Sequence, residues 1–503
     1  MVTPARPAPA PTSSTNAQGP DNPWPALWAL VVGFFMILVD ASIVSIATPA
    51  LMADFGADIE SVVWVTSAYL LAYAVPLLIT GRLGDRFGPK RIYLVGLVVF
   101  TLASLACGLS GSITALVVAR VVQGLGAAMM TPQTMSVITR TFPVDRRGSA
   151  MALWGATAGV AFLVGPLLGG VLLDSVGWEW IFFINVPVGI AGLVAAWRLV
   201  PDLETRGHSF DWVGVVLSAV GLFAVVFAVQ EGERYEWGTI TGPLSVPLLV
   251  VVGLVVLAAF VWWQSRVRPE PLVPLGLFRD RNFSLSNIAI TTMGLAITAM
   301  MFPLLVWLQS VRGLSPTQAA LVLAPQAIAS IVLARPVGQL VDRIHPRILP
   351  TIGLSGFAVT LVVLALLMRA NAPLWAVVLT STFVGVTGAS IWGPLATTAN
   401  RNLPVQLAGA GSGVYNTTRQ VGSVVGSAAI AALMSSRIAA NVGGGAGQGM
   451  SMEGAGSSAQ RIPPAVADAL SKAFGEAMLL PAAVLVVGAL AAAGLERMSH
   501  TKG

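Results

Sequence analysis

Residues 81–91 read Gly-Arg-Leu-Gly-Asp-Arg-Phe-Gly-Pro-Lys-Arg, a short charged and glycine-containing run between two long apolar stretches. A similar run, Gly-Gln-Leu-Val-Asp-Arg, stands at residues 338–343, again directly after an apolar stretch. A motif repeated in this way within one chain predicts two related halves. The apolar stretches on either side of the two runs then decide what kind of halves they are.

Composition places these stretches in a lipid bilayer. Only 10% of the residues are charged and 55% are apolar, whereas about a quarter of an ordinary soluble domain is charged. Runs such as Leu27 to Val39 carry no charge, and with their flanks they reach the roughly 20 residues that cross a hydrocarbon core. Helices satisfy their own backbone hydrogen bonds in lipid, so the chain is predicted to be an all-α membrane protein.

Apolar runs bounded by glycine, proline or charge predict about fourteen spans, arranged as six, then two, then six. The expected spans lie near 26–51, 61–81, 91–110, 113–139, 148–173, 180–200, then 212–230 and 243–265, then 285–310, 316–337, 348–368, 373–396, 408–436 and 476–495.

The same pattern predicts the domain organisation. Residues 1–23 are rich in Pro, Ala, Ser and Thr and are expected to form a disordered cytoplasmic tail. A six-helix bundle is expected over 24–200, two additional linker helices within 201–270, and a second six-helix bundle over 271–503. The glycine-rich segment within 437–475 is expected to be a long outer loop.

The distribution of basic residues predicts the orientation. An even number of spans puts both termini on one side, and cytoplasmic loops are the ones enriched in Lys and Arg. With both termini cytoplasmic, most basic residues fall in inner loops, and the outer segments keep only Arg234, Arg312, Arg369, Arg437, Arg461 and Lys472. We therefore expect a multi-pass protein of the cytoplasmic membrane, and the pI near 10 does not indicate a nucleic-acid partner.

The sequence points to an ion gradient as the energy source. None of the lysines is followed by Ser or Thr, so no phosphate-binding Walker loop is present. The single cysteine, Cys107, excludes disulfides and cysteine metal clusters. No metal and no cofactor are expected. Three histidines fall in inner loops or the tail, where a mid-membrane proton carrier is not expected: His208, His345 and His500.

Two ionisable residues interrupt apolar spans. Asp40 lies within the first span and Arg120 within the fourth, where a charge costs on the order of 3 kcal/mol on insertion scales. Asp40 is either a carboxylate paired to a neighbouring helix or a site that loads a proton or attracts a cation. Arg120 either holds an acid in its charged form or belongs to a static buried pair. Arg419 is expected nearer the inner mouth, where a snorkelling side chain explains it equally well.

A stripe of small residues marks the fifth span. Ala161, Gly165 and Gly169 stand four apart, with Pro166 and Gly170 beside them. Small residues at this spacing let helices approach closely. The stripe predicts either tight packing alone or a helix that seals one route across the membrane.

Together these motifs resemble the major facilitator superfamily, in particular its fourteen-span drug:proton antiporters, over nearly the whole length. The loop motif at 81–91 resembles that family's fold signature. Residues 38–49 resemble its first-span motif, with Ser42 and Ser45 where Thr and Asn are more usual. Further similar stretches are 120–126, 165–170, 178–187, 278–283, 308–316 and 412–422.

The resemblance implies a fold and roles for particular residues. The fold would be two six-helix bundles plus two extra central helices. Asp85 and Arg91 would latch an inner gate, with the carboxylate near a helix N-terminus in the other half. Arg120 would be the coupling base, and Asp40 the acid that exchanges a proton for the drug. The gate loop would include Gly81, Asp85, Arg86, Gly88, Lys90 and Arg91, and the antiporter hinge Gly165, Pro166, Gly169 and Gly170.

A substrate pocket is expected from helical faces alone, and ordinary helix packing explains its residues equally well. The expected lining is Trp64, Tyr69, Met129, Met130, Gln133, Trp154, Tyr415 and Arg419.

The predicted function is proton-coupled efflux of hydrophobic, cationic or neutral drugs or antibiotics by alternating access. The partners would be protons, the lipid bilayer and a lipophilic small molecule, and the transport unit would be a monomer. One alternative is a dedicated exporter of a single endogenous metabolite, such as a self-made antibiotic. The other is a polytopic membrane enzyme, which would need a cluster of His, Asp or Glu at one membrane face.

Overall fold

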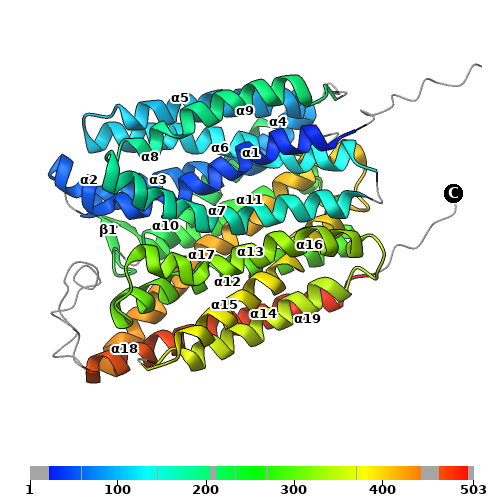
Figure 1. The fold of residues 1–503 in the computed structure, drawn as a ribbon. Helices are drawn as coiled ribbons and strands as arrows, with labels where there is room; N and C mark the ends of the chain where they lie inside the picture. The colour runs from blue at the N-terminus through cyan, green and yellow to red at the C-terminus, as the bar shows by residue number, and fades with distance from the viewer. Residues whose placement is uncertain are drawn as a thin grey trace, which may run out of the picture.

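The computed structural model describes residues 22–496 except 58, 144–145, 204, 206–210, 233, 268–269, 370 and 443–463. It is a bundle of long helices that run roughly parallel to one another (Figure 1). Helix α1 begins and α19 ends at the same end of the bundle, on the right in Figure 1. We call this the termini end, and the end that carries α2, α18 and the strand β1 the outer end. Most of the tail expected over 1–23 lies outside the described residues.

The first six spans are built from nine helices. The second span is broken into α3 and α4, which meet at 46° beside Pro76, because proline lacks the N–H that a continuous helix needs. The bounds are α1 (Trp24–Ile43), a 3-10 turn (Val44–Ala47), α2 (Thr48–Phe55), α3 (Ile59–Ala74), α4 (Leu77–Phe87), α5 (Pro89–Gly108), α6 (Ile113–Thr141), α7 (Arg147–Ser175), α8 (Trp180–Phe183) and α9 (Asn185–Leu199).

The two extra helices and the second group of six spans follow α9 along the chain. The pair is α10 (Trp212–Gln230) and α11 (Val246–Arg266), with the antiparallel strands β1 (Thr239–Thr241) and β2 (Leu244–Ser245) between them. The second group comprises a 3-10 turn (Leu275–Arg279), α12 (Arg281–Val306), a π turn (Trp307–Val311), α13 (Pro316–Val341), α14 (Ile348–Leu367), α15 (Leu374–Ala389), α16 (Trp392–Asn400), a 3-10 turn (Val405–Leu407), α17 (Ala408–Val442), α18 (Pro464–Ala477) and α19 (Leu479–Ala493).

The prediction of an all-helical membrane protein is confirmed. Within the described residues, 13 helices are long and apolar enough to cross a membrane, or 14 when the bent pair α3 and α4 is taken as one span. Most lie within a few residues of an expected span. The first ends at Ile43 and not near 51, and the last begins at Val466 in α18 and not near 476.

The predicted boundaries of the outer loop, 437 and 475, are both wrong, because helices cover part of this range. Helix α17 continues to Val442 and α18 begins at Pro464, and residues 443–463 lie outside the described part. A scan for apolar runs misses α18 because Asp468, Lys472 and Glu476 interrupt it. One of these charges is paired, since Glu476 lies 3.3 Å from Arg437 on α17.

Asp211 holds the two extra helices together. Its carboxylate accepts hydrogen bonds from Gly214 N at the start of α10 (2.8 Å), from Trp263 Nε1 (2.9 Å) and from Gln264 Nε2 (2.7 Å) on α11. Burial alone would raise the pKa of this carboxyl, but the hydrogen bonds outweigh burial and lower the pKa. The carboxylate is therefore charged at neutral pH and fixes the pair as a unit.

Helix α10 also touches both groups of six. Val226 of α10, Leu71 of α3 and Val424 of α17 form one small buried cluster. Nearby, the rings of Phe227 and Trp64 lie 5.8 Å apart, centroid to centroid. The extra pair therefore packs on the side where α3 and α17 meet.

The glycine stripe of α7 packs against α1. A Cβ on Gly165 would overlap Ser42 Oγ and lie 3.2 Å from Val39 O, and a Cβ on Gly169 would lie 2.9 Å from Ile43 Cγ1. Gly170 faces elsewhere, since its nearest neighbour would be Thr317 Oγ1 at 3.9 Å. Close approach of these two helices thus depends on two glycines of the stripe and not on the third.

We predict that Gly165→Ala lowers the thermal stability of the purified chain in detergent. The added methyl would displace the Ser42 hydroxyl from its hydrogen bonds on α1 and crowd Val39 O, and overpacking typically costs about 1–3 kcal/mol. Gly170→Ala, on the same helix, is the matched control and should leave the melting temperature unchanged or slightly raised, since alanine favours helix. Equal melting temperatures for the two variants would contradict the packing role of Gly165.

Candidate functional site

A fully buried ion pair lies in the middle of the first group of helices. Asp40 of α1 and Arg120 of α6 are both 0% exposed. The distance between Arg120 Nη1 and Asp40 Oδ2 is 2.5 Å. An isolated charge in this interior would be very costly, whereas a pair with good geometry and further hydrogen bonds can be accommodated.

Two amide side chains complete the surroundings of the carboxylate. Gln123 Nε2 and Asn185 Nδ2 each donate to Asp40 Oδ1 at 2.9 Å. Gln123 also accepts from Arg120 Nη1 at 2.7 Å, and Asn185 donates to Ser104 Oγ at 3.0 Å. The carboxylate is therefore held by donors from α6 and from the start of α9.

The guanidinium group is held on its other side by α3. Arg120 Nε donates to Val65 O at 3.0 Å, and Arg120 Cζ lies 4.0 Å from the centroid of the Tyr69 ring. Arg120 Nη2 has no hydrogen-bond partner among the described residues. All these contacts come from the first six spans, so the ion pair faces the interior of that group and not the second group.

The two charges stand out in the sequence, but the two amides do not. Gln123 and Asn185 both lie in stretches that carry the family resemblance. The available signal was a polar amide at helical spacing from Arg120, and another at the start of an otherwise apolar helix. Which of them would reach Asp40 depends on how the helices pack, and this cannot be obtained from the spacing.

Asp85 joins the two groups of helices at the termini end. Its two carboxylate oxygens accept from Gly409 N and Ala410 N, each at 2.9 Å, in the first turn of α17. Gly81 allows this contact, because a Cβ there would lie 2.5 Å from Gly409 O. The expected position of the carboxylate beside a helix N-terminus of the other half is what the structure shows. Its role as a gate stays a prediction.

The arginine beside Asp85 is Arg82 and not Arg91, which the family resemblance implied. Arg82 Nη1 lies 3.8 Å from the carboxylate, while Arg91 is exposed on α5. The other gate-loop residues have local roles: Gly88 has φ +93 where α4 ends, Lys90 pairs with Asp202 at 3.3 Å, and Arg86 lies over the Phe87 ring.

The repeated motif makes the same contact in the other half. Asp342 Oδ1 accepts from Gly148 N at 3.2 Å, at the start of α7. A Cβ on Gly338 would lie 2.6 Å from Ser149 Cα. Gly338 therefore allows close approach to α7, in the same way that Gly81 allows close approach to α17. The two contacts close the termini end from opposite pairs of helices. The sequence echo carried this signal, but Asp342 was not predicted as a site residue.

A small cavity lies in the interior between the two groups of helices. It has a volume of about 40 Å³ and is lined by residues of α7, α12, α13, α15 and α16, including Met293, Gln326 and Trp392. Pockets for drug-sized ligands measure about 300–1,000 Å³. A large ligand therefore requires the helices around this cavity to separate.

Buried polar atoms without partners lie along this boundary. Trp154 Nε1, Tyr415 OH, Asn416 Oδ1 and Arg419 Nε have no hydrogen-bond partner among the described residues. Each such atom costs about 1–3 kcal/mol, so this surface suits a ligand or water. Arg419 is 6% exposed and lies 5.9 Å from the Trp392 ring. It does not snorkel to the membrane surface.

The residues expected to line one pocket are separated in the structure. Trp154, Tyr415 and Arg419 lie at the boundary between the two groups. Tyr69 and Met130 are buried in the core of the first group, where Met129 also contacts Gly96. Gln133 donates to Thr80 O at 2.8 Å, and Trp64 packs on α10. A helical face read from sequence does not say which neighbouring helix it meets.

Comparisons with known proteins bear on the fold and the family. The family model described as Major Facilitator Superfamily matches residues 30–427. The human organic anion transporter MFSD10 has a similar solved structure, with a TM-score of 0.62 and 12% sequence identity over 93% of this chain and 100% of that one. This likeness confirms the predicted fold.

Relatives by sequence cover most of the chain. An uncharacterized MFS-type transporter of Mycobacterium tuberculosis is 51% identical over 94% of this chain and 80% of its own length. The tetracenomycin C resistance and export protein of Streptomyces glaucescens is 35% identical over 87% of this chain and 81% of its own. Other relatives are named multidrug resistance or multidrug export proteins.

We predict that Asn185→Ala destabilises the chain through Asp40. Loss of a hydrogen bond to a charged group costs about 1.5–3 kcal/mol. The cost should shrink in the Asp40→Asn background, where that charge is absent, and a double-mutant cycle of melting temperatures measures this coupling.

Asn400→Ala is the matched control, because Asn400 is equally buried and its amide bonds only Ala396 O of its own helix. Its effect should be the same in both backgrounds. An Asn185→Ala effect that is also independent of Asp40 would show that the amide does not support the carboxylate.

Proposed function

The chain belongs to the major facilitator superfamily of membrane transporters, and we propose that it exports lipophilic drugs or antibiotics in exchange for protons. The relatives at 32–35% identity include named drug exporters. Membership in this family makes the chain a transporter and not an enzyme. In the proposed orientation the termini end faces the cytoplasm, as the excess of basic residues in those loops favours.

The observation that carries the proposal is the buried pair of Asp40 and Arg120. A proton on Asp40 would leave the Arg120 charge without its counter-ion in a nearly dry interior, which is strongly unfavourable. Arrival of a proton therefore favours an arrangement in which Arg120 finds water or another partner. The chain thus holds a group whose protonation state and helix arrangement depend on each other, which is what coupling to a proton gradient requires.

A continuous set of contacts links this pair to the termini end. Ser42, two residues after Asp40, meets Gly165 of α7. The same helix begins at the contact between Gly148 and Asp342. A shift of α1 on protonation would thus be passed to α7 and to one of the two closures. We propose that release of both closures opens the substrate site toward the cytoplasm, with the bundles over 24–200 and 271–503 moving as units.

The proposed substrate site lies at the boundary that carries Trp154, Tyr415 and Arg419. Met293 and Met301 line the adjoining cavity, and methionine adapts to ligands of different shape. The position of Arg419 leads us to propose a different substrate charge from the one expected from the sequence. A buried guanidinium with an unpartnered Nε disfavours a cation and suits a neutral or acidic lipophilic compound. Of the cationic or neutral compounds expected from the sequence, only the neutral ones fit this site.

A dedicated exporter of one compound remains the second candidate, since one relative is named for resistance to a single antibiotic. Export of several unrelated dyes supports the broad function, and export confined to one compound supports the dedicated one.

We predict that proton-driven transport depends on both charges of the pair. In inverted membrane vesicles, Asp40→Asn and Arg120→Ala should reduce substrate accumulation to the level seen with an uncoupler, because no group then links protonation to helix arrangement. Asp468→Asn, which removes a carboxylate at the outer end, should keep the wild-type level. Full accumulation in the variant that combines Asp40→Asn with Arg120→Ala would overturn the mechanism.

We predict that Arg419→Gln weakens transport of acidic lipophilic dyes by about tenfold in KM, as expected from the loss of a hydrogen bond between charged groups. Neutral dyes of the same size should be little affected. Arg437→Gln, an exposed arginine at the outer end, is the control. A wild-type preference for cationic over acidic dyes would contradict the assignment.

A further inference from the structure

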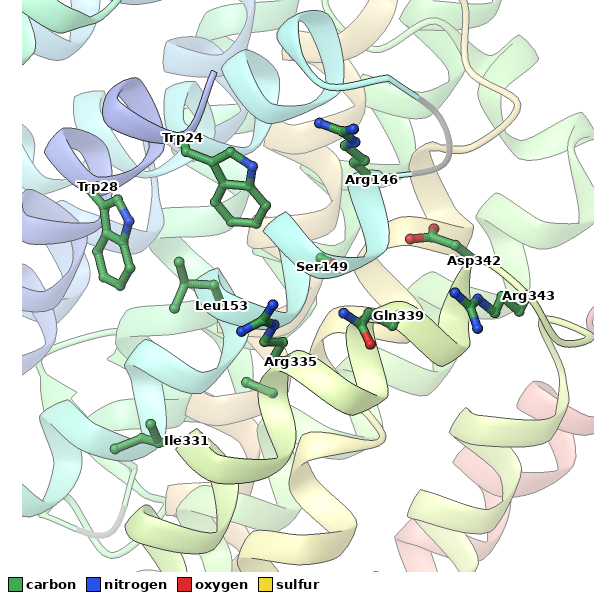
Figure 2. Close-up of a pocket in the computed structure, with 11 residues that line it drawn as sticks. Trp24, Trp28, Arg146, Ser149, Leu153, Ile331, Arg335, Gln339, Asp342 and Arg343 are labelled. Atoms are coloured by element: carbon green, nitrogen blue, oxygen red, sulfur yellow. The ribbon is translucent and has the colours of Figure 1, made fainter. Parts of the chain in front are cut away.

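A second and much larger cavity lies at the termini end, on the side where α7 and α13 meet. Its volume is about 930 Å³. We call it the α7–α13 groove. Its lining comes from α1, from α7 and the residue before it, and from α13 and the two residues after it (Figure 2): Trp24, Trp28, Arg146, Ser149, Leu153, Ile331, Ala334, Arg335, Gln339, Asp342 and Arg343.

The groove carries a net positive charge. Three arginines, Arg146, Arg335 and Arg343, line it together with one carboxylate, Asp342. Figure 2 shows Arg146, Asp342 and Arg343 on one side, the two tryptophans on the other, and Arg335 between them. All three arginines are exposed, so their charges are available to an anion at the surface.

The character of the groove changes along α13. Ile328, Ile331 and Arg335 follow one another at helical spacing on one face. The two isoleucines are 57% and 47% exposed, as expected for side chains in contact with acyl chains. Toward the end of the span the same face carries Arg335, and Arg343 follows two residues after the end of α13. The groove thus has an apolar part at Ile331, which we call its floor, next to a basic part at Arg335 and Arg343, which we call its rim.

The tryptophans place this rim at the membrane surface. Trp24 and Trp28 stand in the first two turns of the first span, and Trp28 is 54% exposed. Tryptophan and arginine are typical of the boundary between acyl chains and headgroups. A basic pocket between helices at this depth has the chemistry that holds anionic headgroups.

We propose that the α7–α13 groove binds one anionic phospholipid of the leaflet at the termini end. Its phosphate lies among Arg146, Arg335 and Arg343, and an acyl chain lies along Leu153 and Ile331. A soluble anion would use only the rim, and a volume of about 930 Å³ far exceeds one phosphate group. The apolar floor is what selects the lipid over the free anion.

The bound lipid also holds the two groups of helices together. Arg146 belongs to the first group, and Arg335 and Arg343 belong to the second. The groove is flanked by the contact between Gly148 N and Asp342 Oδ1, 3.2 Å apart. A headgroup that bridges the arginines is favoured when this contact is made, so the lipid shifts the population toward the arrangement closed at the termini end.

Lipid binding is tested with the purified full chain in nanodiscs of phosphatidylcholine that contain increasing phosphatidylglycerol. The number of phosphatidylglycerol molecules retained is counted by native mass spectrometry. The variant Arg335→Gln with Arg343→Gln should bind phosphatidylglycerol about 25-fold more weakly, at about a factor of five for each arginine. The control variant Arg198→Gln with Arg279→Gln removes two exposed arginines near the same end but outside the groove, and should change binding less than threefold.

Three results would overturn the proposal. The first is unchanged phosphatidylglycerol retention in the groove variant, and the second is an equal loss in the control variant, which would indicate bulk surface charge. The third is saturation of the site by glycerol 3-phosphate as readily as by phosphatidylglycerol, which would make it a site for a free anion. Single variants Arg335→Gln and Arg343→Gln, each with an intermediate loss, keep the test decisive if the double variant folds poorly.

The effect on the closed arrangement has its own readout. Ser330→Cys places a thiol on the wall of the small central cavity, where labelling by a water-soluble reagent requires opening. Phosphatidylglycerol should slow this labelling several-fold with the native groove and leave it unchanged in the groove variant. If phosphatidylglycerol changed the labelling rate neither with the native groove nor in the groove variant, the lipid would not bridge the two groups of helices. The lipid count does not depend on transport, so failure of the proposed export function would leave that test intact.

Discussion

The organisation of the first half depends on the requirement that a charge in the membrane interior be neutralised where it stands. Asp40 and Arg120 meet this requirement for each other, and amides and a backbone carbonyl satisfy most of their remaining hydrogen-bonding groups. To supply these partners, α1, α3, α6 and α9 must converge at one depth. A single ion pair therefore fixes the mutual positions of four helices more narrowly than apolar packing alone would, because lipid-facing apolar surface gives little preference for one arrangement over another.

The boundary between the halves follows a different rule. There the helices approach through glycines, and a carboxylate from one half accepts from the first turn of a helix in the other. This contact occurs twice, once through Gly81 and Asp85 and once through Gly338 and Asp342, in agreement with the internal repeat of the sequence. Such contacts are made of backbone N–H groups and a single side chain. They can form and separate without the repacking of large side chains.

The sequence predicts the fold well, because fourteen long apolar runs and a repeated motif leave few alternatives. It also identifies Asp40 and Arg120, since charge in an apolar run stands out. It does not predict that Gln123 and Asn185 complete the site, or that Met130 and Tyr69 face the interior of one half. These facts depend on helix rotation and on which neighbour each face meets. The amphipathic helix α18 escaped detection for a related reason, because a criterion based on continuous apolar residues discards a helix that carries three charges.

The position of the extra helices bears on the direction of any movement. At the cluster of Leu71, Val226 and Val424, α10 touches both halves along the side where α3 and α17 meet, and Asp211 keeps α11 attached to it. A separation of the halves along that side would have to break this three-way contact, just as a separation along α7 and α13 would have to break the contact between Gly148 N and Asp342 Oδ1. The two extra helices thus hold the two groups of six together at α3 and α17 through packed side chains, which a flexible loop between the groups would not do.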